Sequence, residues 1–312
     1  MDNLILSFTV VFPLFAQLVL GYGLKRIKLL DDHTLSVCNK LVFRVFLPCL
    51  LFLNVYRANL AQVFNARLLA WAAAVILVCF CALMVLVPLF EKDPKKRGVL
   101  VQGIFRSNFA LFGVPVAVSL FGQENSGAAS ILTVVVIPMF NMLSVVALEV
   151  FRGGKPNARR MLLGIAKNPL ILATLTGLVF LLLDLSLPQV IVDALDDISQ
   201  VATPLSLVVL GGSFEFSKLR GSLREMTVGI LGRLVLVPAV FLPLFAFLGF
   251  RGAEMGAALV MLASPTAVSS FPMAIEMDAD GTLAGQIVVG TTLFCIVTLF
   301  FWIFLLKELG WM

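Results

Sequence analysis

Long apolar stretches follow one another along almost the whole chain. Each is about as long as the ~20 residues that an α-helix needs to cross roughly 30 Å of hydrocarbon. Because loops and open sheet edges are unstable inside a bilayer, these stretches predict an all-α integral membrane protein. The ten predicted transmembrane helices span residues 4–24, 34–56, 68–90, 97–122, 128–151, 161–183, 189–213, 225–249, 252–277 and 281–306.

The composition agrees with a membrane environment. Hydrophobic residues make up 60% of the 312 residues and charged residues only 13%, so polar side chains are too few to cover a soluble core. The net charge of +5 does not indicate nucleic-acid binding, because the basic residues gather in short segments between apolar stretches. We therefore expect contact with membrane lipid and no nucleic-acid partner.

The basic residues also predict an orientation in the membrane. With the N-terminus outside, the cytoplasmic loops hold fourteen cations and the opposite loops only four, as the positive-inside rule requires. We expect a multi-pass protein of a bacterial-type inner membrane, with both termini on the non-cytoplasmic side. The first helix is expected to be retained, because Met1-Asp2-Asn3 is not the basic start of a signal peptide. The fourteen cations are Lys25, Arg26, Lys28, Lys92, Lys95, Lys96, Arg97, Arg152, Lys155, Arg159, Arg160, Lys218, Arg220 and Arg224.

Residues that bend helices recur at about half the length of the chain. The paired residues lie 155 to 157 positions apart, which predicts two five-helix repeats over residues 1–156 and 157–312. An odd number of spans per repeat makes the second repeat cross the membrane in the opposite sense. Inverted repeats build sites that alternate between the two sides of a membrane, so they favour a transporter. The pairs are Pro13 and Pro169, Gly21 and Gly177, Pro48 and Pro204, Pro88 and Pro243, and Pro115 and Pro272.

The fourth and ninth predicted helices carry polar residues and prolines well inside their apolar stretches. The fourth contains Arg106-Ser107-Asn108 and then Gly113-Val114-Pro115, and the ninth contains Ser264-Pro265-Thr266 and then Ser269-Ser270-Phe271-Pro272. Proline lacks an amide hydrogen and is tolerated best at the start of a helical segment. We therefore expect both helices to unwind near mid-membrane. The fourth should form half-helices over 97–107 and 115–122, and Pro115 and Pro272 should open the second segments.

Two breaks at equivalent positions of the repeats predict a binding site for a small anion. The positive ends of the half-helices and their free amide donors would face one small volume. Asn108 adds an amide donor, and the serine and threonine residues add hydroxyl groups that suit a carboxylate. The candidate substrate-binding residues are Arg106, Ser107, Asn108, Gly113, Pro115, Ser264, Pro265, Thr266, Ser269, Ser270 and Pro272.

Other roles stay open for individual residues. The prolines could merely kink the two helices, and the hydroxyl groups could bond to carbonyl groups of their own helix. Arg106 lies deep in an apolar stretch, so it binds an anion directly or pairs with a buried carboxylate or with carbonyl groups freed at the break. Arg233 and Asn141 are candidates for a supporting role, but the sequence does not give their rotational positions.

Enzymatic functions find no support in the sequence. His33 is the only histidine and lies beside Asp31 and Asp32 in a charged loop, which excludes a serine–histidine site or a two-histidine zinc site inside the membrane. The five cysteines lie within or at the edges of apolar stretches, where they behave as small apolar residues. We expect no catalytic residues, no bound metal and no cofactor.

Several motifs of the chain are shared with a known family. They are Arg106-Ser107-Asn108-Phe109, Gly113-Val114-Pro115, Phe121-Gly122, Val45-Phe46-Leu47-Pro48 and Ser264-Pro265-Thr266-Ala267. Together they resemble the auxin efflux carrier family, which includes the plant PIN auxin exporters and bacterial permeases for malate or malonate. The resemblance covers essentially the whole chain, although residues 152–160 replace the long hydrophilic loop of many plant members.

The resemblance implies a fold and a function. It implies ten helices in an inverted repeat, a crossover of helices four and nine, and transport of mono- or dicarboxylates such as malate or malonate. Helices 1, 2, 6 and 7, within 4–56 and 161–213, would form a scaffold, and helices 3–5 and 8–10, within 68–151 and 225–306, would carry the substrate. By this likeness Asn108 contacts the carboxylate.

Competing functions remain open at this point. A sodium/proton antiporter normally has aspartates where its broken helices cross, and residues 105–116 and 262–273 contain none. A sodium-coupled symporter of the bile-acid type and a non-transporting receptor for a small acid both fit the same pattern. The residues do not determine whether a proton or sodium is the coupling ion, or whether the chain forms a homodimer.

Overall fold

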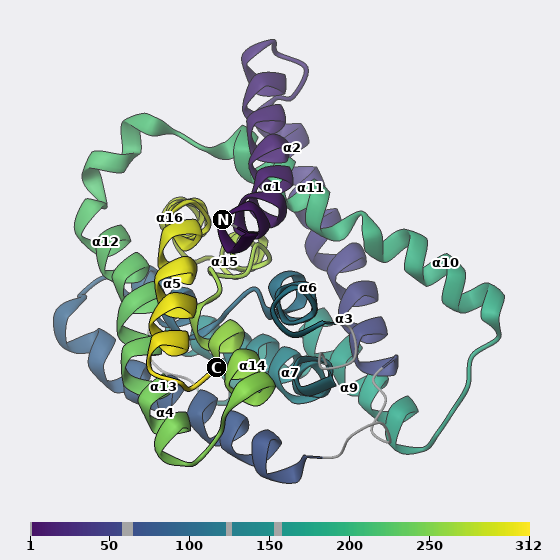
Figure 1. The fold of residues 1–312 in the computed structure, drawn as a ribbon. Helices are drawn as coiled ribbons and strands as arrows, with labels where there is room; N and C mark the ends of the chain where they lie inside the picture. The colour runs from purple at the N-terminus through teal and green to yellow at the C-terminus, as the bar shows by residue number, and fades with distance from the viewer. Residues whose placement is uncertain (1, 58–64, 123–126, 153–157) are drawn as a thin grey trace.

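The computed structural model describes residues 2–57, 65–122, 127–152 and 158–312 (Figure 1). The described residues are almost entirely helical, and an isolated bridge between Ser107 and Thr266 is the only β-type pairing among them. The predicted all-α fold is confirmed. The elements of the first half are α1 (Asp2–Arg26), α2 (Asp32–Leu41), the π turn η1 (Val42–Phe46), α3 (Leu47–Tyr56), α4 (Ala66–Phe90), α5 (Pro94–Phe105), α6 (Phe109–Phe121) and α7 (Gly127–Val150).

The second half follows a similar course. Its π turn η4 interrupts a long helix, as η1 does in the first half. The elements are α8 (Ala158–Ala166), α9 (Pro169–Leu182), α10 (Gln189–Gln200), α11 (Ala202–Ser213), the 3₁₀ helix η3 (Phe216–Gly221), α12 (Leu223–Leu231), η4 (Gly232–Leu236), α13 (Val237–Phe247), α14 (Gly252–Ala263), α15 (Ser270–Glu276) and α16 (Gly281–Glu308).

Five continuous helices among the described residues are long and apolar enough to cross a membrane. They cover Asp32–Tyr56, Ala66–Phe90, Gly127–Val150, Leu223–Phe247 and Gly281–Glu308. Shorter apolar helices cover Phe109–Phe121, Pro169–Leu182 and Gly252–Ala263. This set indicates a multi-pass membrane protein, while the arrangement of ten spans as an inverted repeat stays a prediction.

The fourth and ninth predicted helices are interrupted, as expected. Residues 106–108 lie outside any helix between α5 and α6, and residues 264–269 lie between α14 and α15. The predicted bounds of the fourth helix were wrong, because α6 begins at Phe109, where the Asn108 carbonyl accepts the first helical hydrogen bonds. Pro115 therefore lies inside α6 rather than at its start. In this position it removes a single hydrogen bond from the helix.

The sixth and seventh predicted helices are divided, which the sequence analysis did not anticipate. Asn168 caps α9 and Pro169 is its first residue, so α9 begins as a helix separate from α8. Pro204 lies in the first turn of α11 and disfavours continuation from α10, which ends at Gln200. Pro48, its partner in the repeat, likewise lies in the first turn of α3. The prolines of the second half thus begin separate helices, whereas Pro48 lies within the continuous helix Asp32–Tyr56 and Pro13 lies inside α1.

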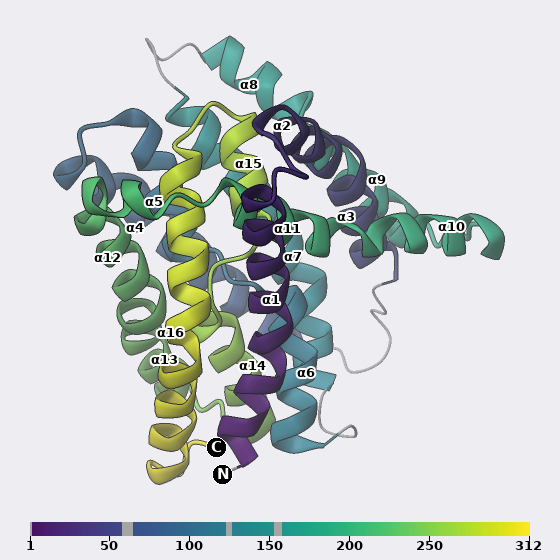
Figure 2. The same cartoon turned by 90° about the horizontal axis from the view of Figure 1, so that it is seen from above.

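Two helix pairs pack at backbone distance and join the halves of the chain. A Cβ atom on Gly21 of α1 would lie 2.0 Å from the Val208 carbonyl oxygen of α11, so no larger residue fits there without a shift. Gly177 of α9 has the same role against Phe52 of α3, at 2.9 Å. Figure 2 shows α1 beside α16, both ends of the chain at the same end of the bundle, and α10 projecting sideways.

Candidate functional site

The two helix breaks meet and cross near the centre of the molecule. The amide nitrogen of Asn108 donates to the carbonyl oxygen of Pro265 at 2.7 Å, and Ser107 forms an antiparallel bridge with Thr266. The breaks therefore touch through their backbones rather than through side chains alone. This contact fixes where α6 and α15 begin relative to each other.

A cavity of about 140 Å³ lies beside the crossing. Residues of both breaks form one part of its wall, and residues of α3, α6, α7 and α11 form the rest. None of the described residues that line it is acidic, so its one formal charge is the guanidinium group of Arg106. The volume suits a small ligand, because sites for drug-sized ligands measure ~300–1,000 Å³. The polar lining residues are Asn54, Arg106, Ser107, Asn108, Asn141, Thr203, Ser206 and Ser269.

Arg106 is deeply buried, with 3% of its surface exposed. Its guanidinium group donates to Asn141 Oδ1 and to Ser269 Oγ and contacts the sulfur of Met273. These partners are neutral, and no acidic side chain in the described part of the chain forms an ion pair with Arg106. Of the three roles considered for this residue, pairing with a carboxylate and pairing with freed carbonyl groups are thus not observed, and the cation lines the cavity.

Two polar groups next to Arg106 have no protein partner. Asn108 Nδ2 and Ser107 Oγ are both buried and make no hydrogen bond to the described protein. Leaving a buried donor unpaired costs about 1–3 kcal/mol, so such groups usually mark a place where water or a ligand binds. Together with Arg106 they offer amide, hydroxyl and guanidinium donors to the same cavity.

The start of α6 adds backbone donors to this group. Asn108 is the N-cap residue of α6, but its side chain does not bond to the first turn of the helix. The first amide groups of a helix have no helical acceptor and carry a partial positive charge. The cavity is lined by Ala110 of this first turn. The second expected helix end is weaker, because α15 has only seven residues.

Seven of the predicted site residues do not line the cavity. Thr266 instead serves the crossing, because its hydroxyl donates to the Gly103 carbonyl at 2.7 Å and its amide nitrogen contacts Thr291 Oγ1. Ser264 and Ser270 are buried with hydroxyl groups that have no partner. The seven residues outside the cavity lining are Gly113, Pro115, Ser264, Pro265, Thr266, Ser270 and Pro272.

The structure adds residues that the sequence analysis did not place in the site. Asn54 of α3, and Thr203 and Ser206 of α11, contribute polar groups to the cavity wall. Asn141 was expected only in a supporting role, and it both lines the cavity and bonds to Arg106. Thr203 and Ser206 are three residues apart and so lie on one helix face, a pattern that the sequence contains. The pattern does not show whether that face is turned toward a cavity.

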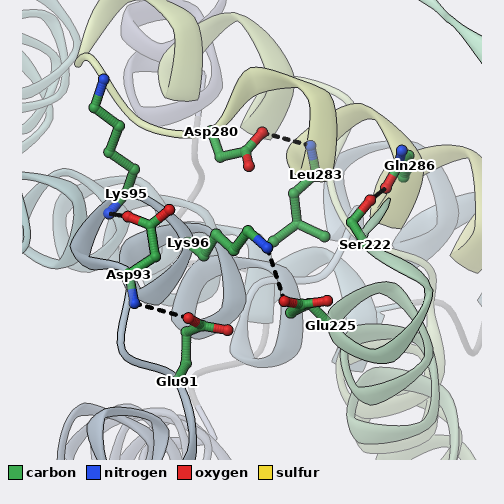
Figure 3. Close-up of polar contacts among 9 residues, drawn as sticks. All are labelled: Glu91, Asp93, Lys95, Lys96, Ser222, Glu225, Asp280, Leu283 and Gln286. Atoms are coloured by element: carbon green, nitrogen blue, oxygen red, sulfur yellow. Dashed lines mark hydrogen bonds and ion pairs between the residues drawn. The ribbon is translucent and has the colours of Figure 1, made fainter. Parts of the chain in front are cut away.

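An ion pair and two hydrogen bonds link three helices away from the cavity (Figure 3). Lys96 at the start of α5 pairs with Glu225 of α12 at 2.7 Å, with the two side chains 20% and 18% exposed. The amide nitrogen of Asp280, which caps α16, donates to the Lys95 carbonyl at 3.2 Å. Ser222 also bonds to Gln286 of α16. These contacts link the starts of α5, α12 and α16.

Apolar helices long enough to cross a bilayer, and a cationic cavity at the crossing of two broken helices, define this protein as a membrane transporter. The comparison with known sequences agrees, since residues 6–303 match the family described as membrane transport protein. The chain belongs to this family, the auxin efflux carrier family that its motifs resemble. Its members are named as transporters and not as enzymes.

Related proteins cover nearly the same length. An uncharacterised transporter of Methanothermobacter thermautotrophicus is 26% identical over 300 residues, covering 94% of this chain and 96% of its own. A second uncharacterised transporter, from Methanocaldococcus jannaschii, is 21% identical over 94% of this chain and 96% of its own. A protein of Rhizobium meliloti named "Putative malonate transporter" is 22% identical over 96% of this chain and 95% of its own.

Proposed function

We propose that this protein is a secondary active transporter of small organic anions, with mono- or dicarboxylates such as malate or malonate as substrates. The observation that carries the proposal is the buried Arg106 cation beside the unpaired Asn108 amide, in a cavity whose described lining holds no acidic group. The name of the Rhizobium relative supports the choice of malonate as the first substrate to test.

Each polar group has a role in this proposal. The substrate carboxylate accepts hydrogen bonds from Asn108 Nδ2, Ser107 Oγ and the first amide groups of α6. Arg106 supplies the opposite charge, and a charge-assisted hydrogen bond is about twice as strong as a neutral one. Leucine and isoleucine side chains in the wall contact the short carbon chain of the acid. Few fixed cations are needed, which limits the cost of placing charge inside the membrane.

Substrate movement in this proposal requires two groups of helices that shift relative to each other. The first group, the scaffold, comprises the predicted helices within 4–56 and 161–213. The close packing of α1 on α11 and of α3 on α9 is the evidence for this grouping. In this proposal the cavity lies between the scaffold and the crossing, which is supported by its lining, because residues of α3 and α11 line it together with residues of both breaks. Asn39 of α2 donates to Glu276 of α15 at 3.1 Å, a contact between the groups that must break when they move.

The proposed topology keeps ten spans in an inverted repeat with both termini on the non-cytoplasmic side of an inner membrane. The position of both chain ends at one end of the bundle supports it (Figure 2). The turn from α1 to α2, with the cations Lys25, Arg26 and Lys28, lies at the other end, where the cytoplasm would be.

Uptake into proteoliposomes tests the proposal. Purified protein is reconstituted, and uptake of radiolabelled malonate, malate and monocarboxylates is measured with and without sodium and with and without a pH gradient. We expect saturable uptake of at least one acid and competition by related acids. Vesicles that contain equal amounts of the Asn108→Ala variant provide the control, and we expect no uptake from them.

The alternatives give different results in the same assay. A sodium-coupled symporter of the bile-acid type would take up bile acids rather than short carboxylates and only with sodium present. A receptor would bind an acid, as measured by calorimetry, without moving it across the bilayer. Either result, or normal uptake by Asn108→Ala, contradicts the proposal.

A further inference from the structure

A second arginine lies at the crossing and does not line the cavity. Arg233 belongs to the π turn η4, in the middle of the long helix formed by α12 and α13. Its side chain is completely buried, with 0% of its surface exposed. A Cβ atom on its neighbour Gly232 would lie 3.0 Å from the side chain of Ile104, so glycine lets η4 approach α5 closely.

The guanidinium group of Arg233 binds the ends of both broken helices. Nη1 donates to the carbonyl groups of Ile104 and Phe105, at 3.2 and 2.9 Å, where α5 ends. Nε donates to the Ser264 carbonyl at 2.8 Å and Nη2 to that of Met261 at 2.7 Å, where α14 ends. One side chain thus holds the carboxyl ends of two helices from different halves of the chain.

The chemistry of these partners explains why arginine occupies this position. The last carbonyl groups of a helix have no helical donor and carry a partial negative charge. A cation placed between two such ends is compensated without any carboxylate, and no acidic side chain in the described part of the chain pairs with Arg233. The planar fork of arginine reaches several acceptors at fixed angles, whereas lysine offers one compact charge.

The carbonyl groups that Arg233 holds adjoin the residues of the cavity. Phe105 precedes Arg106 in the chain, and Ser264 precedes Pro265, whose carbonyl binds the amide of Asn108. A shift of either helix end would therefore displace the donors that face the cavity. Fixing a binding site to within about half an ångström requires that its supporting residues be held in place.

We infer that Arg233 is a positioning residue: it fixes the ends of α5 and α14 to each other so that the unwound residues after them present Asn108, Ser107 and Arg106 to the cavity. It acts through the crossing and does not touch the substrate. The inference about the crossing stands on the geometry, and only its effect on uptake rests on the proposed function.

A disulfide across the crossing tests the inference without any substrate. Ser107→Cys and Thr266→Cys are introduced together into a chain whose five native cysteines are replaced by alanine. Residues opposite each other in an antiparallel pair have Cα atoms about 4.5–5.5 Å apart, within the range of about 4.4–6.8 Å that a disulfide needs. The rate of disulfide formation under mild oxidation is followed by mass spectrometry of the linked peptides.

Three further variants are compared in this background. Arg233→Met removes the fork and the charge, and Arg233→Lys keeps the charge alone. Arg251→Lys is the matched control, because Arg251 also donates to carbonyl groups, those of Ala246 and Phe250, and neither of these belongs to a break. We expect both Arg233 variants to slow disulfide formation several-fold and Arg251→Lys to leave it unchanged.

The outcomes separate this inference from the proposed function. Equal rates in all four proteins would overturn it. Failure of both Arg233 variants to reach the membrane in folded form would also overturn it, because the residue would then be needed for folding rather than for positioning. In reconstituted chains that keep Ser107 and Thr266, Arg233→Lys should raise the KM for the transported acid. Slowed disulfide formation together with no uptake by the unmodified protein would leave the inference intact and reject the transport proposal.

Discussion

The two buried arginines of the crossing have opposite surroundings. Arg233 is bonded to four backbone carbonyl groups at the ends of two helices and does not line the cavity. Arg106 is bonded to neutral side chains and borders a cavity together with the unpaired amide of Asn108. The charge of Arg233 lies among helix ends, whereas that of Arg106 borders the cavity without a charged partner in the described part of the chain. Following the two proposals above, we call these the structural side and the binding side of the crossing.

Removal of the unpaired amide should have the largest effect on the binding side. Asn108→Ala is expected to abolish uptake of the transported acid, because a hydrogen bond to a charged group contributes about 1.5–3 kcal/mol and the cavity would lose its central donor. The measurement is initial uptake in proteoliposomes, with the folded state checked by gel filtration in detergent. Normal uptake would place the substrate elsewhere.

Removal of the cation from the binding side should come next. Arg106→Gln keeps a donor to Asn141 and Ser269 but removes the charge, so we expect substrate affinity to fall by at least about 30-fold, the effect of losing ~2 kcal/mol from a buried charge pair. Arg106→Lys keeps the charge and should retain part of the affinity. Calorimetric titration with the transported acid gives both values. Unchanged affinity together with reduced expression would show that Arg106 is structural, and the comparison with Arg233 would fail.

Two serines sharpen the boundary of the binding side. Ser107 and Ser144 are both buried with unpaired hydroxyl groups, but only Ser107 lines the cavity. Ser107→Ala should weaken substrate binding by about 10-fold, the lower end of the range for one hydrogen bond to a charged group. Ser144→Ala should leave binding unchanged. Equal effects of the two substitutions would show that the substrate does not bond to the Ser107 hydroxyl group.

The smallest effect is expected for charges outside the crossing. Lys96→Gln removes the ion pair with Glu225 near the surface, where such pairs contribute about 0–1 kcal/mol. We expect a thermal midpoint in detergent only slightly below that of the unmodified protein, and unchanged KM. A large loss of uptake would mean that the group formed by α5, α12 and α16 depends on this pair to move as a unit.

Both breaks could be located from the sequence, but their ends could not. Polar residues and prolines inside apolar stretches have a local cause, because proline removes a helical hydrogen bond wherever it lies. The start of α6 depends instead on the contact between Asn108 and Pro265, which joins distant parts of the chain. Pro115 was for this reason expected at a helix start, although it lies inside α6.

The composition of the binding site shows the same division. Asn108, Ser107, Arg106 and Ser269 line the cavity and were identified from the sequence as candidates. The polar residues of α3 and α11 were missed, because an isolated polar residue in a long helix faces a cavity only if the helix is turned that way. Pairing with carbonyl groups freed at a break was one of the roles left open for Arg106, and the structure shows this pairing at Arg233 instead.

A helical membrane protein with two interrupted helices could be predicted from the sequence, because hydrophobic length and proline act over a few neighbouring residues. The polar residues Ser107 and Asn108 also made Arg106 a candidate for the site. The bonding partners of the two arginines could not be predicted, because they depend on what the rest of the folded chain brings within hydrogen-bonding distance of each guanidinium group.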